Sequence, residues 1–427
     1  MNIFKSWATW SLIITFVVGG LSAIGGLVSP TTAVVMGTNS IAVGSGASIG
    51  STSTTSLAIN GTTSSSSTGT LTGNIVIGIP GTPATMSVTT GSISNSIAIG
   101  AGATNAVTTN ANSNSIAIGT GANTGYAGST NTINGPIAIG NGAAAAETGI
   151  AIGTNAIGSV HTAGSGIAIG NGANANGYSA AHNIVLGDSA SVNNSSYSSS
   201  QSILVGYQAS AKGTPSNNVN GGIAIGSAAQ ANGGSSSSSI TNNYGQLAIG
   251  YSAQANYSGS IAIGTYSKAD GNGMMSLATG AFAAQGDMSI GSFPLFTYTT
   301  GVTATEMNVG IGTYATTTTS FITLINLSSY FFEVDIVAQT KGGGVDTATW
   351  QLRFAIQRGA AAANTILVGT PSGTTAPLFA TAGATTGAWA VAVTADTTNG
   401  RPAIKVTGTA ATNISWVATV KMTKVGY

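Results

Sequence analysis

The sequence predicts an all-β protein in which a parallel β-solenoid is followed by an antiparallel β-sandwich. Three observations support this: an Ile-Ala-Ile-Gly motif recurs through the middle of the chain, that region holds almost no charge, and apolar and polar residues alternate in its C-terminal third. A further apolar stretch begins the chain. We therefore divide it into an apolar N-terminal anchor segment (1–35), a repeat shaft (36–285) and a C-terminal β-sandwich (286–427).

The repeat predicts short stacked strands. Alternation places both Ile residues of a copy on one face and the Ala on the other, and the closing Gly permits a tight bend. A strand this short cannot bury a face alone, but stacked coils can, so we expect the Ile pairs to form a ladder inside the solenoid. Clear copies begin at Ile97, Ile116, Ile137, Ile150, Ile167, Ile223 and Ile261, and variants begin at Ile41, Leu57, Ile75, Ile184, Ile203, Leu247 and Leu277.

Two units, Asn-Ser-Ile-Ala-Ile-Gly at 95–100 and again at 114–119, resemble the head repeat of trimeric autotransporter adhesins. The resemblance covers about 36–285, although the spacing is looser here than in that family. It implies a left-handed parallel β-roll and a homotrimer in which three rolls pack side by side. It also implies that Ala98, Ala117 and Ala138 face outward and let neighbouring rolls approach, so that Ala117→Glu should dissociate the trimer.

Composition excludes several classes of protein. The 427 residues contain 10 Lys+Arg and 9 Asp+Glu, so only 4% are charged, against about 25% in an average soluble domain. A nucleic-acid-binding surface needs clustered Lys and Arg, so we expect no nucleic-acid partner. With 2 His and no Cys, most catalytic and metal-binding sets lack their residues, and we predict no enzyme, no cofactor and no catalytic, cofactor-binding or metal-binding residues.

The N-terminal segment 6–29 carries no charge and includes Trp7 and Trp10. Its length suits a membrane span, a secretory signal or an apolar plug held in a larger particle. We favour an anchor, either held in a larger particle or embedded in a membrane through residues 7–29, over an export signal or an ordinary core helix.

The C-terminal region holds 13 of the 19 charged residues. Segment 330–339 alternates, with Phe332, Val334 and Ile336 opposite Glu333 and Asp335. Several such strands between Gly-rich turns predict an antiparallel sandwich. Segments 365–370, 389–396, 404–408 and 414–418 resemble C-terminal β-domains of bacteriophage fibre and other virion proteins. The other predicted strands are 349–357, 386–394, 403–407 and 413–420.

The candidate sites have plainer alternatives. Glu333 and Asp335 share a strand face and could act as acid and base or bind a cation, but we interpret them as a solvated polar face. His161 or His182 could place one imidazole per chain on a trimer axis and bind a metal, which we do not expect. The Gly119-Thr120-Gly121 turn lacks the Gly-Lys-Ser/Thr of a phosphate loop. Five tyrosines in the inserts could stack on sugars: Tyr126, Tyr178, Tyr197, Tyr244 and Tyr257.

We therefore predict a structural trimeric fibre or spike of a virus particle, in particular a bacteriophage, that projects from the virion and mediates host-surface attachment. The N-terminal segment would contact other virion proteins, and the C-terminal domain a host glycan or protein. The alternatives are a bacterial cell-surface trimeric adhesin, an architectural shell or sheath protein without a receptor, and an enzyme acting on surface glycans. The sequence shows neither a heptad stalk nor membrane-barrel strands after the repeat, which favours the viral interpretation.

Overall fold

The computed structural model describes residues 40–44, 47–49, 53–65, 69–107, 111–125, 133–146, 148–158, 165–176, 182–193, 201–213, 218–232, 242–309, 321–341 and 346–426. The predicted anchor segment, 1–35, lies outside them. Among these residues no helix has the length and apolar character needed to cross a bilayer. The chain divides into two compact units, Met1–Ser165 and Gly166–Tyr427, and each is described by itself.

The first unit is a parallel β-solenoid whose coils have up to three strand walls. In the first wall each three-residue strand pairs in register with the next, so that Ile97 lies beside Ile116 and Ala98 beside Ala117. This wall contains β1 (Ile41–Val43), β4 (Leu57–Ile59), β7 (Ile75–Ile77), β10 (Ile97–Ile99), β13 (Ile116–Ile118), β15 (Ile137–Ile139) and β16 (Ile150–Ile152). The second contains β2 (Ser48–Ile49), β5 (Thr62–Ser65), β8 (Thr85–Val88) and β11 (Thr104–Val107), and the third β3 (Ser53–Thr54), β6 (Thr70–Thr72), β9 (Ser92–Ser94), β12 (Ala111–Ser113) and β14 (Ile133–Asn134).

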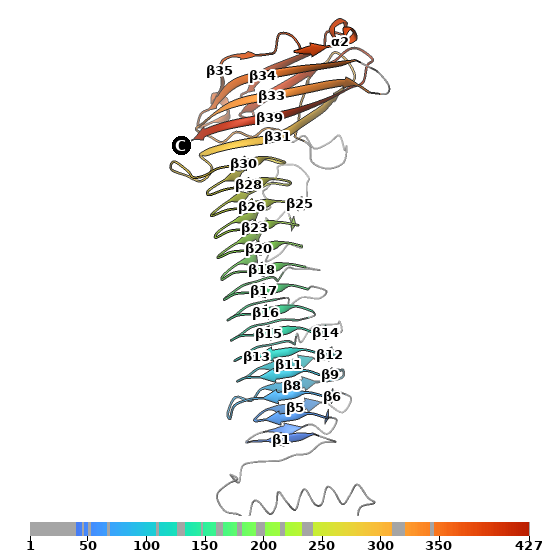
Figure 1. Ribbon diagram of the computed structural model, residues 1–427, viewed down its shortest axis with the longest axis vertical. Coiled ribbons are helices and arrows are strands. Elements are labelled where there is room, and N and C mark those ends of the chain that lie inside the picture. The colour runs from blue at the N-terminus through green and yellow to red at the C-terminus, as the bar shows by residue number, and fades with distance from the viewer. Residues whose placement is uncertain are drawn as a thin grey trace, which may run out of the picture. The chain divides into compact units, whose positions relative to one another are not determined.

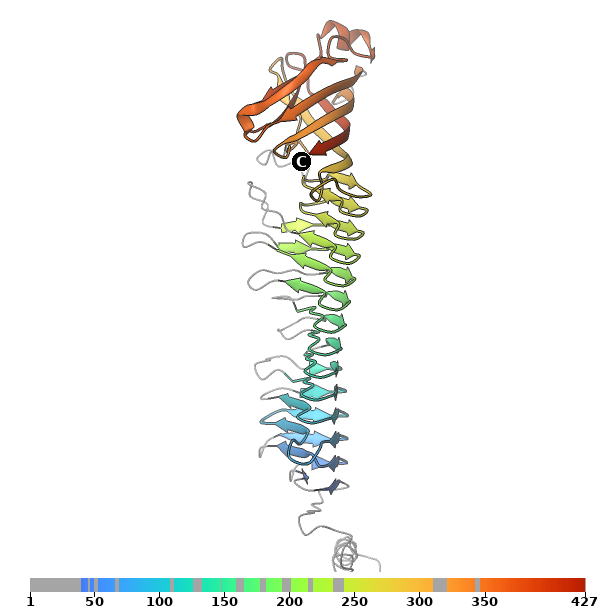
Figure 2. The same cartoon turned by 90° about the vertical axis from the view of Figure 1, so that its left-hand side faces the viewer.

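The second unit begins with a solenoid of the same kind (Figures 1 and 2). Its main wall contains β17 (Ile167–Ile169), β18 (Ile184–Leu186), β20 (Ile203–Val205), β23 (Ile223–Ile225), β26 (Leu247–Ile249), β28 (Ile261–Ile263) and β30 (Met275–Leu277). Another wall contains β19 (Ser191–Asn193), β21 (Ser210–Lys212), β24 (Gln230–Asn232), β27 (Gln254–Ala255) and β29 (Lys268–Ala269), and a short pair is formed by β22 (Asn218–Asn220) and β25 (Asn242–Tyr244). The predicted all-β solenoid is confirmed, and every predicted start except Leu277 is the first residue of a strand. In β30 that position is Met275, which pairs with Ile261.

Each residue of the Asn-Ser-Ile-Ala-Ile-Gly unit has a distinct role in the coil. Asn114 turns the chain with a left-handed φ of 55°, a conformation that Asn tolerates better than most residues. Ser115 points inward, where its Oγ lies 2.9 Å from the Oγ of Ser96 in the neighbouring coil. Gly119 has a φ of 131°, and a Cβ there would lie 2.3 Å from the carbonyl oxygen of Gly140. Only glycine fits that position, because successive coils approach at the backbone.

The direction of the Ile and Ala side chains is the reverse of the prediction. Ala98, Ala117 and Ala138 are fully buried, while the Ile residues that flank each of them remain partly exposed. The small-residue tail of each repeat supplies further buried alanines, such as Ala122. In the coils from Ala117 to Ala156 the core cluster consists of alanine alone. The coils from Leu71 to Ala103 are filled by other inward side chains, such as Met86 and Ile93, and not by the Ile pairs of the motif. The predicted internal Ile ladder and the outward alanines are therefore both wrong.

An antiparallel β-sandwich follows the shaft in the second unit (Figure 1). Its larger sheet is formed by β31 (Met288–Thr299), β39 (Ile414–Gly426), β33 (Ser328–Thr340), β34 (Thr347–Arg358), β35 (Thr365–Ser372) and β36 (Phe379–Ala380), and its smaller sheet by β32 (Thr305–Glu306), β38 (Arg401–Thr407) and β37 (Ala390–Asp396). Strand β31 pairs with β30 of the last coil, so one hydrogen-bonded sheet runs from shaft to sandwich. Two short helices, η1 (Ala362–Asn364) and α2 (Ala382–Thr386), lie in the connections.

The sandwich core is rich in aromatic side chains, in contrast to the alanine and aliphatic side chains that fill the coils. The fully buried Trp416 packs against Trp350 and Trp389, with ring centroids 5.4 and 5.9 Å apart, and its indole N–H donates to Thr299 Oγ1 at 2.9 Å. The predicted alternation of 330–339 is confirmed by β33, in which Phe332, Val334 and Ile336 are buried. The predicted strand at 386–394 is wrong at its start, since Thr386 ends α2 and β37 begins at Ala390.

Candidate interaction surface

The outward side chains of the shaft form two apolar columns, which we call the Ile columns. In the second unit the first column contains the first residue, and the second column the third residue, of each strand of the main wall. Their exposure is substantial for such large apolar side chains: Ile225 and Leu277 are each 40% exposed, whereas Ala224 between the columns is 0% exposed. Every residue in both columns is Ile, Leu, Val or Met. The first unit has the same arrangement, with Ile41 49% and Val43 44% exposed.

Such a face is unusual on a soluble monomer. Contiguous exposed apolar patches beyond a few hundred Å² mark interaction surfaces, and neither column contains a charged or hydrogen-bonding side chain. The arrangement can exclude water against another apolar surface, but it offers no group for acid–base or nucleophilic chemistry.

Aromatic side chains gather on turns of the second unit's shaft. Tyr207 and Tyr251 each follow the closing glycine of a coil and are 55% and 50% exposed. Tyr266, one position later in its own turn, meets Tyr251 edge-to-face, with ring centroids 5.3 Å apart. These rings lie on the coil turns rather than in the Ile columns.

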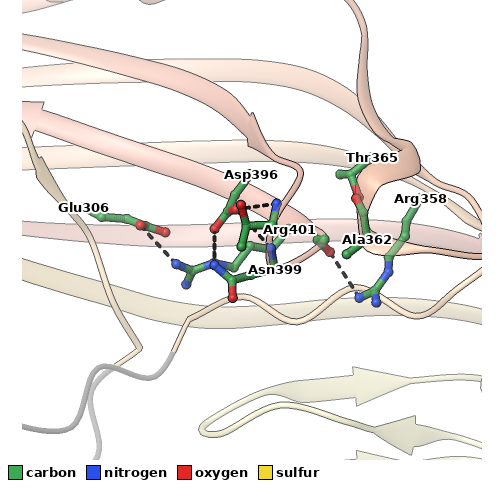
Figure 3. Close-up of polar contacts among 9 residues, drawn as sticks. Glu306, Arg358, Ala362, Thr365, Asp396, Asn399 and Arg401 are labelled. Atoms are coloured by element: carbon green, nitrogen blue, oxygen red, sulfur yellow. Dashed lines mark hydrogen bonds and ion pairs between the residues drawn. The ribbon is translucent and has the colours of Figure 1, made fainter.

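A few charged side chains of the sandwich form ion pairs, and three of them make one cluster. Arg401 donates from Nε to Asp396 Oδ2 at 2.9 Å and from Nη2 to Glu306 Oε2 at 3.3 Å (Figure 3), and its guanidinium lies over the Phe321 ring. Burial tends to raise the pKa of Asp396, but hydrogen bonds from Asn399 and Arg401 outweigh it and hold that pKa well below its usual range. Burial raises the pKa of Glu306, against the attraction of Arg401. The cluster joins β32 to the turn between β37 and β38, and its arginine bridges both carboxylates.

A small cavity of about 30 Å³ lies between the last coil and the sandwich. Lys268 and Asp270 form an ion pair at its wall, 3.1 Å apart, and the buried Lys424 donates a hydrogen bond to the Gly286 carbonyl. Burial lowers the pKa of the Lys424 amine to about 8 and raises that of the Tyr330 hydroxyl to about 12. A space of this size suits one or two water molecules and is too small for a sugar.

The candidate carboxylates Glu333 and Asp335 are each engaged by a side chain of the neighbouring strand. Glu333 and Asp335 do share the outer face of β33, but each meets a side chain of β34: Arg353 Nε lies 3.2 Å from Glu333 Oε1, and Gln351 Nε2 donates to Asp335 Oδ1 at 3.2 Å. Within the residues that the structure describes, no three His, Cys, Asp or Glu side chains are grouped as metal ligands.

The other candidates give no assembled site. His161, Tyr126, Tyr178 and Tyr197 lie outside the described residues, as does the side chain of Tyr244, while His182 is exposed. Tyr257 is partly buried, and burial raises the pKa of its hydroxyl. The Gly119-Thr120-Gly121 segment is a coil turn, as its repeat context indicated.

Sequence reasoning missed the Ile columns, although a signal for them was present. Ala103, Ala122 and Ala143 recur five residues after the central alanine of their repeats, and all three are fully buried. Two small inward positions per coil imply a narrow interior. Bulky Ile side chains must then point outward.

No protein-family model and no curated protein matches the chain. Among solved structures, it is similar to the tailspike protein of Acinetobacter baumannii phage AM24, with 11% identity and a TM-score of 0.23 over 92% of this chain and 75% of that one. A TM-score this low carries no argument about fold or function.

Proposed function

We propose that this chain is a non-catalytic, homotrimeric attachment fibre or spike of a virus particle, in particular a bacteriophage. The observation that carries the proposal is the pair of Ile columns, a long, uncharged and periodic apolar face on a stack of parallel coils. In an isolated chain this face would meet water. Packed against copies of itself it would be buried, and the shaft would become stiff.

Three copies are supported by the resemblance of the Asn-Ser-Ile-Ala-Ile-Gly repeat to the heads of trimeric adhesins. The Ile columns take the part that the sequence had assigned to Ala98, Ala117 and Ala138. A trimer would also present three copies of any recognition site on one rigid support, so that avidity could hold a surface that a single site binds weakly.

The sandwich is the part we assign to recognition of a host glycan or protein. It carries most of the charges of the chain, and it exposes large apolar side chains in the segment leading into β36. There Leu378 is 61% and Phe379 71% exposed. The N-terminal segment is assigned to anchoring in the particle, as an apolar stretch at the start of the chain.

The trimer is tested by measuring the mass of the full chain by light scattering. We expect three times the 41.5 kDa of one chain, and a single-chain mass for the double variant Ile225→Lys/Ile263→Lys. A matched control is Tyr207→Lys, which places the same charge on an exposed side chain outside the columns and should leave the mass unchanged. A wild-type chain that runs as a folded monomer would contradict the proposal.

Attachment is tested with the fluorescent full chain on cells of the bacterium that the phage infects. We expect cell-surface binding that Phe379→Ser weakens, with trimer mass retained. A trimer located in purified particles that binds no cell would favour the architectural alternative, and location on a bacterial envelope would favour the adhesin. Release of soluble sugar from the cells would refute the non-catalytic assignment.

A further inference from the structure

The second Ile column continues onto the sandwich. Leu277, its last member in the shaft, lies directly beside Ile290 of β31 in the antiparallel register. From Ile290 the same row crosses the outer face of the larger sheet through Thr423 and Phe331 to Ala355 and Val368. The large apolar side chains of this row are at least as exposed as Leu277, which is 40% exposed: Ile290 is 60%, Phe331 43% and Val368 55% exposed. We call Ile290, Phe331 and Val368 the sandwich column.

The sandwich row that continues the first Ile column is polar and charged. Met275 lies beside Ser292, and that row continues through Lys421, Glu333 and Arg353. Glu333 therefore lies between two cations on the outer sheet face, and its Oε1 is 3.2 Å from Arg353 Nε. The apolar strip thus narrows from two columns to one as it enters the sandwich, with a charged row along one side.

The partner that fits this strip is a second copy of the chain. Shaft side chains recur in every coil, at about 4.8 Å per strand, and a surface with the same period complements them over their whole length. On the side of the sandwich column away from the charged row lies a further row that contains Val425 and Ile366. Together with the second unit's Ile columns and the sandwich column, it contributes to a set of twelve large apolar residues that are more than a third exposed. At ~60 Å² each, they expose ~700 Å², close to the ~800 Å² per partner of a standard interface. They are Ile169, Ile184, Ile203, Ile225, Ile263, Met275, Leu277, Ile290, Phe331, Ile366, Val368 and Val425.

We propose that the contact between chains extends beyond the shaft onto the sandwich, along the sandwich column, and that the charged row of Lys421, Glu333 and Arg353 forms its boundary. This inference rests on the proposed trimer and makes it more specific. The sandwiches are then held against one another at fixed positions, and the remainder of the outer sheet face stays free. Val337, 51% exposed on the same face of β33, lies outside the contact.

Thiol labelling tests this directly, because the chain contains no cysteine. Single-cysteine variants of the full chain would be F331C and I290C in the sandwich column, V337C outside it and I263C in the shaft. In an isolated chain the first three positions are similarly open to solvent, so a small maleimide would react with them at similar rates. In the assembly we expect F331C and I290C to react at least ten-fold more slowly than V337C, and I263C to be protected as well.

The outcomes are distinguishable when labelling is combined with the mass of each variant. Rapid labelling of F331C and I290C in a trimer whose I263C is protected would overturn the sandwich contact and leave the shaft trimer intact. Protection of V337C to the same extent would overturn the proposed boundary. Rapid labelling at all four positions in a single-chain species would overturn both this inference and the trimer of the proposed function.

Discussion

Ala117→Glu separates the two possible orientations of the repeat. In the structure Ala117 is fully buried and lies beside Ala98 and Ala138 of the adjacent coils. A glutamate there overfills a packed interior, which costs ~1–3 kcal/mol, and it places an unpaired carboxylate away from water, which costs several kcal/mol more. The sum approaches the whole stability of a typical domain, ~5–15 kcal/mol. We therefore expect the coils around Ala117 to unfold.

The matched control is Ile118→Glu, one residue further along β13. Ile118 is partly exposed in an Ile column, so its glutamate can remain in water and the coil should stay folded, while packing between chains is lost. Thermal melting by circular dichroism, limited proteolysis and mass measurements distinguish the two variants. If Ala117→Glu kept wild-type melting and proteolysis and altered only the mass, the inward assignment of alanine would be refuted.

Three further predictions concern stability. Burial lowers the pKa of Lys424 from 10.5 to about 8, so the free energy of unfolding should rise as the pH increases from about 8 to 10.5. Lys424→Met should remove this rise and stabilise the chain at pH 7 by up to ~3 kcal/mol, measured by denaturant titration. The pKa of Asp396 is lowered, so its contribution to the free energy of unfolding is present above its unfolded pKa of 3.8 and is lost on further acidification. Asp396→Asn should lower the free energy of unfolding by ~2 kcal/mol at pH 7 and reduce the acid dependence of melting. An unchanged dependence of melting on acid pH would contradict this. Gly140→Ala should lower the melting temperature at least twice as much as Gly121→Ala. A Cβ at Gly140 would lie 2.3 Å from the Gly153 carbonyl oxygen, whereas one at Gly121 would meet nothing within 4 Å. Equal losses of melting temperature would show that backbone strain alone matters.

The repeat predicted the solenoid well because a motif of fixed length specifies strand positions directly. Apart from Leu277, each predicted start coincides with the beginning of a strand. Alternation alone cannot say which face of a strand is inside, since it fixes only that Ile and Ala lie on opposite faces. Hydrophobicity favours Ile inside, but the width of the coil decides the question, and in the structure Ala117 shares a core cluster with Ala122, the second small inward residue of its repeat.

The sandwich was predicted where its strands alternate plainly, as in β33, and missed where they do not. Strand β31 was not predicted, because its sequence mixes Gly291, Pro294 and several hydroxyl residues with aromatics. Its position is fixed by pairing with the last coil and with β39, and these contacts join residues far apart in the sequence. The sandwich column depends on the same register and could not be predicted without it.

The alanine interior of the coils affects which positions can change. In most globular domains a core of large side chains can be repacked with others of similar volume, whereas the coils from Ala117 to Ala156, whose core cluster is alanine alone, allow few alternatives. The inserts between coils are free of this constraint, because extra residues leave the strand register unchanged. Shafts built in this way can accept new loop sequences and additional coils while the pairing of their main-wall strands stays the same.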